Sequence, residues 1–183
     1  MIRAFLLITI FAAAALCAAG GPVDLSGRAF DPFSQPARVR VLVFVRTDCP
    51  ITNRYAPELS RIAAEFSGQG VAFWIVYPDA SETPASIRAH LAAYHFPGQP
   101  LRDLDHELVR RAHVSVAPEA AVFNSSGVLV YHGRIDDRYV DWGKARAQAT
   151  THDLEDAIAA VLAGRPVRRS VTRAIGCSLA DVE

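Results

Sequence analysis

The chain has 183 residues, 51% of them hydrophobic, and its 19 basic and 19 acidic side chains give a formal net charge of zero. This length suits one domain with extensions, and the hydrophobic content is sufficient for a packed core. A neutral chain without a run of basic residues argues against nucleic acid or a membrane surface as a partner.

Residues 1–19 have the pattern of a secretory signal peptide. A positive charge at Arg3 is followed by an apolar stretch over residues 4–16 and by small residues that offer a cleavage site. The apolar part is shorter than the ~20 residues of a membrane span. We therefore expect an exported protein, periplasmic or secreted, with no membrane span in the mature chain. An uncleaved N-terminal anchor and a lipid-modified Cys17 are the alternatives.

Strands and helices alternate in the rest of the chain. Continuous apolar runs predict buried strands, and apolar residues at i, i+3, i+4 and i+7 predict helices. A lead-in over 20–38, which we expect to pair with an edge strand, precedes a domain over 39–164, and a basic tail over 165–183 carries Cys177. Within the domain we predict, in order, a strand at 39–45, a helix to about residue 66, a strand at 71–77, helices at 81–94 and 101–112, strands at 120–123 and 128–131, a polar loop at 136–150 and a helix at 152–163.

This order predicts an α/β fold with a central mixed sheet flanked by helices. The first two strands are joined by a helix, which favours a parallel pair with a right-handed crossover. The next two strands are joined by Asn124-Ser125-Ser126-Gly127, a hairpin signal.

The segment 47–55, TDCPITNRY, carries the strongest chemical signal. It places Cys49 between a buried strand and a helix N-terminus, where unpaired N–H groups and the helix dipole favour a thiolate. A cysteine so placed is usually a nucleophile. Pro50 and the polar Asp48, Thr52 and Asn53 argue for an exposed position, whereas a buried structural cysteine is the alternative.

From about Val39 to Ala163 the chain resembles the thioredoxin-like redoxins, the group that contains alkyl hydroperoxide reductases, thiol-specific antioxidant proteins and exported thiol–disulfide oxidoreductases. The resemblance rests on the strand followed by DCP, a helix kinked by Pro57, Ala117-Pro118 before a strand, and the hairpin FNSSGVLVYHGRID. It implies a thioredoxin fold. It also implies that Pro118 is a cis proline that faces the active cysteine and presents the substrate backbone.

The motif around Cys49 departs from each branch of this group. Thioredoxin-type reductases use Cys-x-x-Cys, but Thr52 stands in the place of the second cysteine. Peroxiredoxins carry a threonine or serine three residues before the cysteine, where this chain has Arg46. Copper-delivery relatives carry Cys-x-x-x-Cys-Pro, where this chain has Val45. The resemblance therefore predicts the fold more firmly than the reaction.

Cys177 is the only other cysteine of the mature chain, and it can resolve a product formed at Cys49. In this fold the final helix runs away from the active end. An extended tail from Gly164 to Cys177 reaches roughly 40 Å at ~3.3 Å per residue, and the helix that it must retrace is only about 18 Å long. A redox pair and a permanent disulfide bond are both reachable, and the alternative is an unpaired cysteine used for a partner protein.

Three further side chains are candidates for binding the substrate. Arg54 lies five residues after Cys49, and Arg138 and Trp142 belong to the polar loop, which leaves the hairpin at the active end in this fold. The alternatives are a helix-surface charge for Arg54 and a solvated insertion for the loop.

The resemblance implies a thiol-dependent oxidoreductase acting on a protein or small-molecule thiol, disulfide or peroxide, with no cofactor. The alternative is a non-catalytic module that binds a partner or a metal. The six histidines lack metal-ligand spacing, but Cys49 and Cys177 with His132 form a conceivable copper or zinc site.

Overall fold

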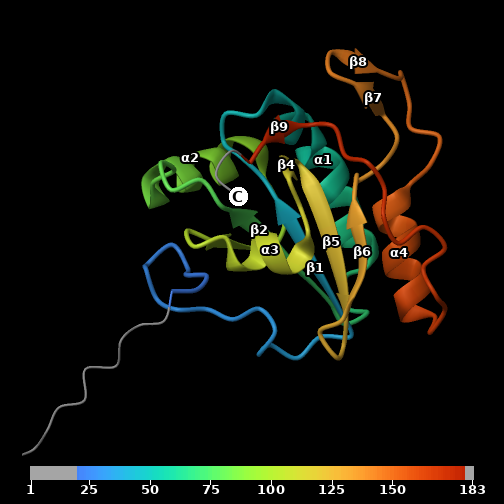
Figure 1. Ribbon diagram of the computed structural model, residues 1–183, viewed down its shortest axis with the longest axis horizontal. Coiled ribbons are helices and arrows are strands. Elements are labelled where there is room, and N and C mark those ends of the chain that lie inside the picture. Colours follow the sequence, from blue (N-terminus) through green and yellow to red (C-terminus); the bar gives the residue numbers. More distant parts are fainter. Residues whose placement is uncertain (1–19, 180–183) are drawn as a thin grey trace, which may run out of the picture.

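The computed structural model describes residues 20–179, and the signal peptide predicted for residues 1–19 lies outside this range. A five-stranded sheet forms its centre, in the order β3-β2-β1-β5-β6 (Figure 1). The central strand β1 (Val39–Phe44) is buried at every position, as its apolar run predicts. It pairs in parallel with β2 (Val71–Tyr77) and antiparallel with β5 (Glu119–Asn124).

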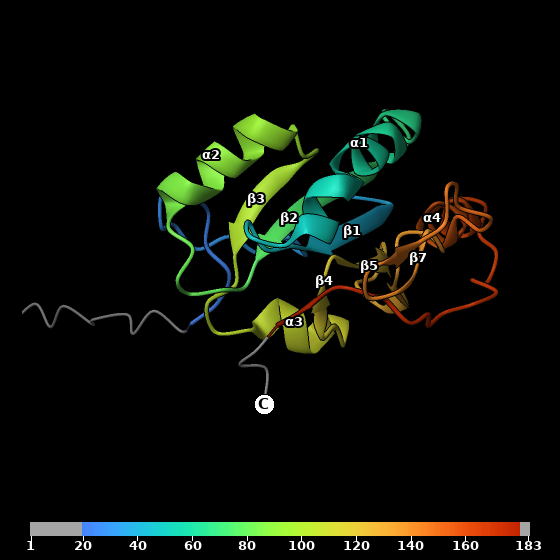
Figure 2. The same cartoon turned by 90° about the horizontal axis from the view of Figure 1, so that it is seen from above.

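Helices cover both faces of the sheet (Figure 2). One core joins the sheet to α1 (Pro50–Glu65), α2 (Pro84–Tyr94) and α4 (Asp153–Leu162), through residues such as Leu59, Ile87 and Ile158. The other joins the opposite face to α3 (Glu107–Ala112) through Leu108 and Val109. Pro57 lies inside α1, and the described helices include none that is long and apolar enough to cross a membrane.

The helix predicted for residues 101–112 is wrong over its first half. Residues Gln99–Arg102 form β3, a third parallel strand beside β2, and only α3 at the end of this segment is helical. Leu101, Leu104 and Leu108 have helical spacing, but Leu101 is buried in the sheet while Leu104 is largely exposed. The lead-in pairs at this edge as expected, because Val23 bridges to Arg102.

The second half of the chain forms the predicted hairpin and final helix. β5 pairs antiparallel with β6 (Leu129–Gly133), and both strands are slightly longer than predicted. The polar loop contains a short hairpin of its own, β7 (Tyr139–Asp141) with β8 (Lys144–Ala145). Gly133 lies opposite Ala120, and Glu119 lies opposite Phe44. The loop therefore leaves the sheet at the end where β1 leads into α1.

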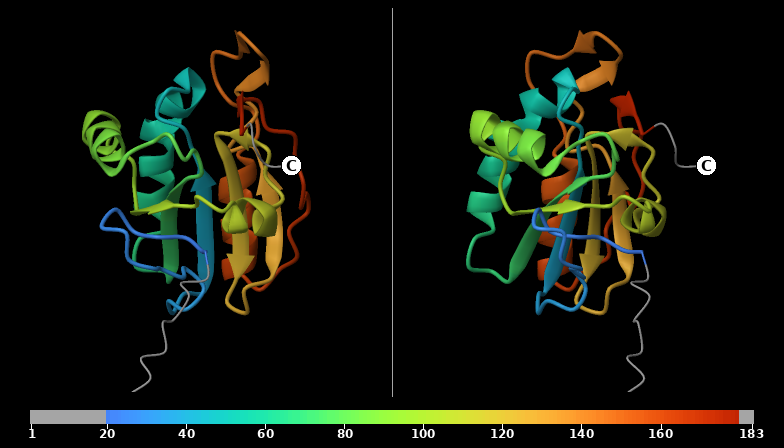
Figure 3. Two further views of the ribbon diagram at one scale, coloured as in Figure 1. Left: turned by 60° about the vertical axis from the view of Figure 1, so that its left-hand side comes forward. Right: turned by 90° about the vertical axis from the view of Figure 1, so that its left-hand side faces the viewer.

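The tail after α4 returns along the sheet and crosses the end where β1 leads into α1, which we call the active end (Figure 3). We call residues 165–179 the strap. It first follows β6, where His132 donates its N–H to Ser170 and accepts from the N–H of Thr172. It ends in β9 (Cys177–Ser178), which pairs antiparallel with β4 (Val116–Ala117). The sequence predicted that the tail can reach this end, but neither β4 nor β9.

Candidate active site

Cys49 is the N-cap residue of α1, at the strand-to-helix junction that the sequence predicts. Its backbone is extended (φ −85°, ψ 113°), Pro50 opens the helix, and the Cys49 carbonyl accepts the N–H of Asn53 at 3.1 Å. The expected exposure is wrong, because Cys49 is 0% exposed. The strap lies across this helix end, and its Cys177 contacts the Cys49 sulfur.

The strap brings Cys177 to Cys49 by pairing with the segment before Pro118. Cys177 lies opposite Ala117 in the β4–β9 pair, and the Cys49 sulfur lies 3.1 Å from the Ala117 carbonyl oxygen. The Ala117–Pro118 peptide bond is cis, as the resemblance implies. Both cysteines are free thiols, and the Cys177 thiol lies close enough to the Cys49 sulfur to affect its acidity. Three of the four residues expected to form the catalytic site therefore meet here.

The two thiols have opposite shifts in acidity. Burial alone would raise the pKa of Cys49, but hydrogen bonds from the Cys177 thiol and from Thr52 outweigh it and lower that pKa. Burial, and then the hydrogen bond to Cys49, raises the pKa of Cys177 to about 12. The Ala117 carbonyl opposes ionisation, because it accepts a hydrogen bond only from a protonated Cys49. On balance Cys49 ionises first, beside a Cys177 thiol that stays protonated.

Thr52 completes the predicted set, on the first turn of α1. Its backbone N–H and its hydroxyl both lower the pKa of Cys49. The hydroxyl is fully buried, yet among residues 20–179 it makes no hydrogen bond of normal geometry. A buried hydroxyl without a partner costs free energy. The Cys49 thiolate is a better acceptor than the thiol, so ionisation of Cys49 supplies the partner that this hydroxyl lacks.

The predicted substrate-binding residues lie apart from the two sulfurs. Arg54 is exposed on α1 and, within the described part of the chain, makes no hydrogen bond or ion pair. Arg138 and Trp142 lie on the polar loop, which is fixed at the active end because the Tyr55 hydroxyl donates to Asp136 at 2.5 Å. Trp142 is 62% exposed and lines a groove of about 450 Å³ beside the strap, with Gly176 on the same wall.

The conceivable metal site is not assembled in the described residues. His132 lies with its Nδ1 3.5 Å from a Glu119 carboxylate oxygen, on the far side of β5 from β1. The single group of at least three possible ligand side chains found among residues 20–179 consists of Glu58, His152 and Glu155, and it contains neither cysteine.

Three residues that hold the site together were not singled out as functional from the sequence. The Nη1 of Arg46 donates to the Ser178 carbonyl at 3.1 Å, which ties the strap to the segment before Cys49. Glu82 is buried and accepts the N–H of Thr47 at 2.5 Å, and its burial raises the pKa of this carboxyl. Gly176 packs so tightly that a Cβ there would lie 2.1 Å from the Ala117 carbonyl oxygen. Nothing local in the sequence marks these three residues, because the partner of each lies far from it along the chain.

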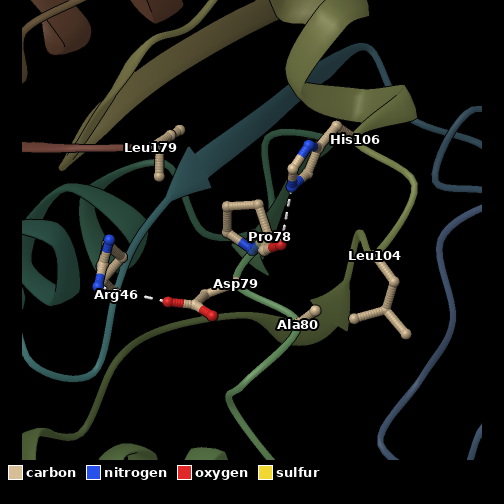
Figure 4. Close-up of a pocket in the computed structure, with 7 residues that line it drawn as sticks. All are labelled: Arg46, Pro78, Asp79, Ala80, Leu104, His106 and Leu179. Atoms are coloured by element: carbon tan, nitrogen blue, oxygen red, sulfur yellow. Dashed lines mark hydrogen bonds and ion pairs between the residues drawn. The ribbon is translucent and has the colours of Figure 1, made fainter. Parts of the chain in front are cut away.

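A small pocket lies beyond the end of the strap (Figure 4). Its volume is about 200 Å³, and its wall includes Arg46, Asp79, His106 and the strap residue Leu179. Arg46 forms an ion pair with Asp79 at 3.3 Å, and His106 contacts the Pro78 carbonyl at 3.0 Å. Each of these side chains therefore already has a partner, and the pocket borders the site without containing either sulfur.

The model of the AhpC/TSA family matches residues 15–132, which is more than half of the chain. The chain belongs to the AhpC/TSA family. None of the curated proteins matches it.

Solved structures confirm the thioredoxin-like fold of this AhpC/TSA protein. A hypothetical protein from Sinorhizobium meliloti superposes with a TM-score of 0.72 at 24% identity, covering 85% of this chain and 87% of the other. An uncharacterised conserved protein from Geobacillus kaustophilus gives 0.75 at 21%, covering 87% of each. A secreted disulfide oxidoreductase of Mycobacterium tuberculosis gives 0.52 at 22%, covering 79% and 94%.

Proposed function

We propose that this protein is an exported thiol–disulfide oxidoreductase whose redox centre is the pair Cys49 and Cys177. The observation that carries the proposal is the meeting of two free thiols beside cis-Pro118: Cys177 lies opposite Ala117, and the Cys49 sulfur lies 3.1 Å from the Ala117 carbonyl oxygen. In this proposal Cys177 replaces the missing second cysteine of the Cys-x-x-Cys motif. The centre cycles between a dithiol and an intramolecular disulfide, and it requires no cofactor.

The split in acidity supports a redox role over an inert pair of buried thiols. Thiol–disulfide exchange needs a thiolate and a leaving thiol of low pKa. Cys49, with its lowered pKa, meets both needs, and Cys177 supplies the proton that stabilises its thiolate. Thr52 and Pro118 are the supporting residues of the centre, and Arg54, Arg138 and Trp142 remain candidates for contacts with a partner.

Disulfide chemistry is favoured over peroxide chemistry by the surroundings of Cys49. The sulfur is fully buried. Arg46, which stands where a peroxiredoxin carries threonine or serine, is occupied with Asp48, Asp79 and the strap. A peroxide would therefore have to reach a covered sulfur without the usual polar cradle.

Export is supported by the apolar N-terminal pattern and by the chemistry proposed. A stable disulfide cycle belongs in an oxidising compartment. The similar Mycobacterium tuberculosis protein is described as secreted. Detection of the protein in a periplasmic or culture fraction, with its N-terminus trimmed near residue 20, tests this part of the proposal.

The redox proposal is tested by equilibration of the full chain in glutathione redox buffers, followed by acid quenching and mass spectrometry. We expect a single two-electron transition between two free thiols and a Cys49–Cys177 disulfide. Cys49→Ser and Cys177→Ser should each abolish the transition. Two free thiols under oxidising conditions would overturn the proposal.

A parallel arm tests the non-catalytic alternative. The protein is titrated anaerobically with Cu(I) alone, because thiolate pairs suit this soft metal. Stoichiometric copper uptake that disappears in either serine variant, together with no two-electron transition, would favour a metal-binding module. Hydrogen peroxide is added to a third sample, and we expect it to oxidise the reduced protein more slowly than glutathione disulfide.

A further inference from the structure

The two sulfurs of the proposed redox centre differ in how a partner can reach them. Cys49 is 0% exposed, with the Ala117 carbonyl and Cys177 against its sulfur. Cys177 is partly exposed and lies on the strap, which passes outside the end of α1 that carries Cys49. The thiol with the lower pKa is therefore the inner one, and the thiol of the strap is the outer one.

Attack on a disulfide is directional. The incoming thiolate approaches along the line of the breaking S–S bond, from the side opposite the leaving sulfur, so access to each sulfur decides which one is attacked. For attack at Cys177, this line extends from the Cys49 sulfur through the Cys177 sulfur, so the thiolate comes from the outer side of the strap. For attack at Cys49, it would start within the packed core that includes Cys49 and Tyr55. With the strap in place, the partly exposed Cys177 is the more accessible of the two sulfurs.

We propose that an external thiolate, on a protein or a small molecule, attacks the redox centre at Cys177, so that Cys177 carries the mixed disulfide and Cys49 is the leaving group. This inference rests on the proposed Cys49–Cys177 redox pair. It reverses the order of the two cysteines that the sequence suggests, in which Cys49 contacts the substrate and Cys177 resolves.

The reaction balances when two molecules of an external thiol serve as the reductant. The external thiolate forms a bond to the Cys177 sulfur, the bond between the Cys177 and Cys49 sulfurs breaks, and its electron pair stays on Cys49 as a thiolate. A second external thiolate then attacks the partner's sulfur in the mixed disulfide. This attack releases the oxidised partner as a disulfide and leaves Cys177 to take up a proton. In total, two thiols are oxidised and the Cys49–Cys177 disulfide is reduced.

The surroundings of Cys49 suit a leaving group. A thiol of lower pKa leaves faster, and the pKa of Cys49 is the lowered one of the pair. The N–H and hydroxyl of Thr52 point to the same sulfur, and this hydroxyl has no other partner of normal geometry among the described residues. The thiolate that is expelled therefore meets donors that are already in position.

The strap holds Cys177 in place throughout the step. Its backbone pairs with Ala117, the next residue's carbonyl accepts from Arg46, and the Leu179 N–H donates to the Ser115 carbonyl at 3.0 Å. Gly176 allows the close approach, since any Cβ there would meet the Ala117 carbonyl. These bonds are made by Cys177 and by the two residues that follow it, so the partner can bind to Cys177 without displacing this end of the strap.

The test is a single-turnover reaction of the fully oxidised full chain with glutathione. Samples are quenched with acid at successive times, and peptide mapping by mass spectrometry locates the glutathione adduct. When the adduct amounts are extrapolated to zero time, we expect at least about tenfold more glutathione on Cys177 than on Cys49. Adducts that begin on Cys49, or in equal amounts on both sulfurs, would overturn the inference.

A variant pair shows that an adduct on Cys49 is detectable. Gly176→Ala forces the strap away from Ala117, and its share of adduct on Cys49 should rise. Ser178→Ala changes an exposed side chain two residues further along the strap and should behave as wild type. If wild-type protein has no Cys49–Cys177 disulfide before glutathione is added, the proposed function itself fails. If the disulfide is present but the adduct starts on Cys49, only this inference fails.

Discussion

Thr52 stands where a Cys-x-x-Cys motif has its second thiol, and it keeps one property of that thiol. In place of an S–H it turns a hydroxyl and a backbone N–H towards Cys49, and both lower the pKa of the cysteine. The hydroxyl cannot form a disulfide. Acidification of Cys49 and closure of the disulfide are thus divided between two residues, Thr52 and Cys177.

Thr52→Val should make Cys49 a weaker acid. A hydrogen bond to a charged group contributes about 1.5–3 kcal/mol, so the thiolate fraction at a given pH below the pKa should fall at least about tenfold. The ultraviolet absorbance of the thiolate, followed through a pH titration of the reduced protein, measures this. Thr52→Ser keeps the hydroxyl and is the control, and an unchanged titration in the valine variant would contradict the role given to Thr52.

Gly176→Ala should destabilise the docked strap. The residue does not have a positive φ, so the cost comes from the contact with the Ala117 carbonyl rather than from backbone conformation. Forcing a methyl group into a packed site costs roughly 1–3 kcal/mol. Denaturant unfolding of the reduced protein measures the loss, and Ser178→Ala should stay within about 0.5 kcal/mol of wild type. Equal stability of the two variants would show that the strap adjusts without cost.

The residues of the site differ in how far the sequence could reveal them. Cys49 and Pro118 were predictable because strand, helix and motif fix their positions locally. The burial of Cys49 was not, because its cover comes from a segment 128 residues later. Glu82 and Arg46 look like ordinary surface charges in the sequence, and their partners, Thr47 and Ser178, become neighbours only when distant elements meet.

Among the elements, the strap connects the proposed redox centre to β6, at the edge of the sheet. Thr172 is its main side-chain anchor: its hydroxyl oxygen accepts the N–H of Arg134 at 3.1 Å and lies 2.7 Å from the Tyr131 hydroxyl. The strap also passes so close to Gly133 that a Cβ there would lie 2.2 Å from the Thr172 carbonyl oxygen. The segment around Thr172 therefore fixes both where the strap lies along β6 and how closely it packs there.

Thr172→Val should loosen the strap while the sheet stays folded. Each hydrogen bond lost contributes about 0.5–1.5 kcal/mol. We expect faster native-state hydrogen exchange at the Leu179 amide, which donates to Ser115, and unchanged exchange in β1. Thr172→Ser keeps the hydroxyl and is the control. Equally protected Leu179 amides in both variants would show that β9 docks independently of Thr172.

The short and edge elements are those that the sequence pattern missed. Long apolar runs identified β1 and β2 because burial on both faces leaves a continuous signal. β3 has four residues and includes Pro100, so its pattern merged with that of the following helix. β4 and β9 have two residues each and exist only because they pair with each other.

At the scale of the whole molecule, the proposed disulfide would join the strap to the central domain. It would close a loop from residue 49 to residue 177, and loops of about 100 residues give up to ~4.7 kcal/mol in the chain-entropy model. We expect the oxidised protein to unfold at a higher denaturant concentration than the reduced protein. Its free energy of unfolding should be larger by up to about 5 kcal/mol. Cys177→Ser should remove the difference between the two conditions, and a difference that persists there would contradict this origin.

The reduction potential should also depend on pH in two steps. Below the pKa of Cys49, reduction of the disulfide takes up two protons, and the potential falls by about 59 mV per pH unit. Between that pKa and about 12, the pKa of Cys177, one proton is taken up and the slope should halve to about 30 mV per unit. Equilibration with redox buffers across this pH range measures both slopes. A reduction potential that falls with the same slope up to pH 11 would contradict the difference in pKa between Cys49 and Cys177.

The position of Cys177 so far along the chain has a consequence for biosynthesis. The five strands of the central sheet are complete at Gly133, whereas Cys177 lies 44 residues further on. At ~5–20 residues per second, a ribosome needs roughly 2–9 s to cover that distance. In a chain that folds as it emerges, Cys49 is an uncovered single thiol during this interval, and in an oxidising compartment it is open to cross-linking with other chains. A chaperone or a reducing escort that shields this thiol until the strap emerges would therefore raise the yield of correctly paired protein.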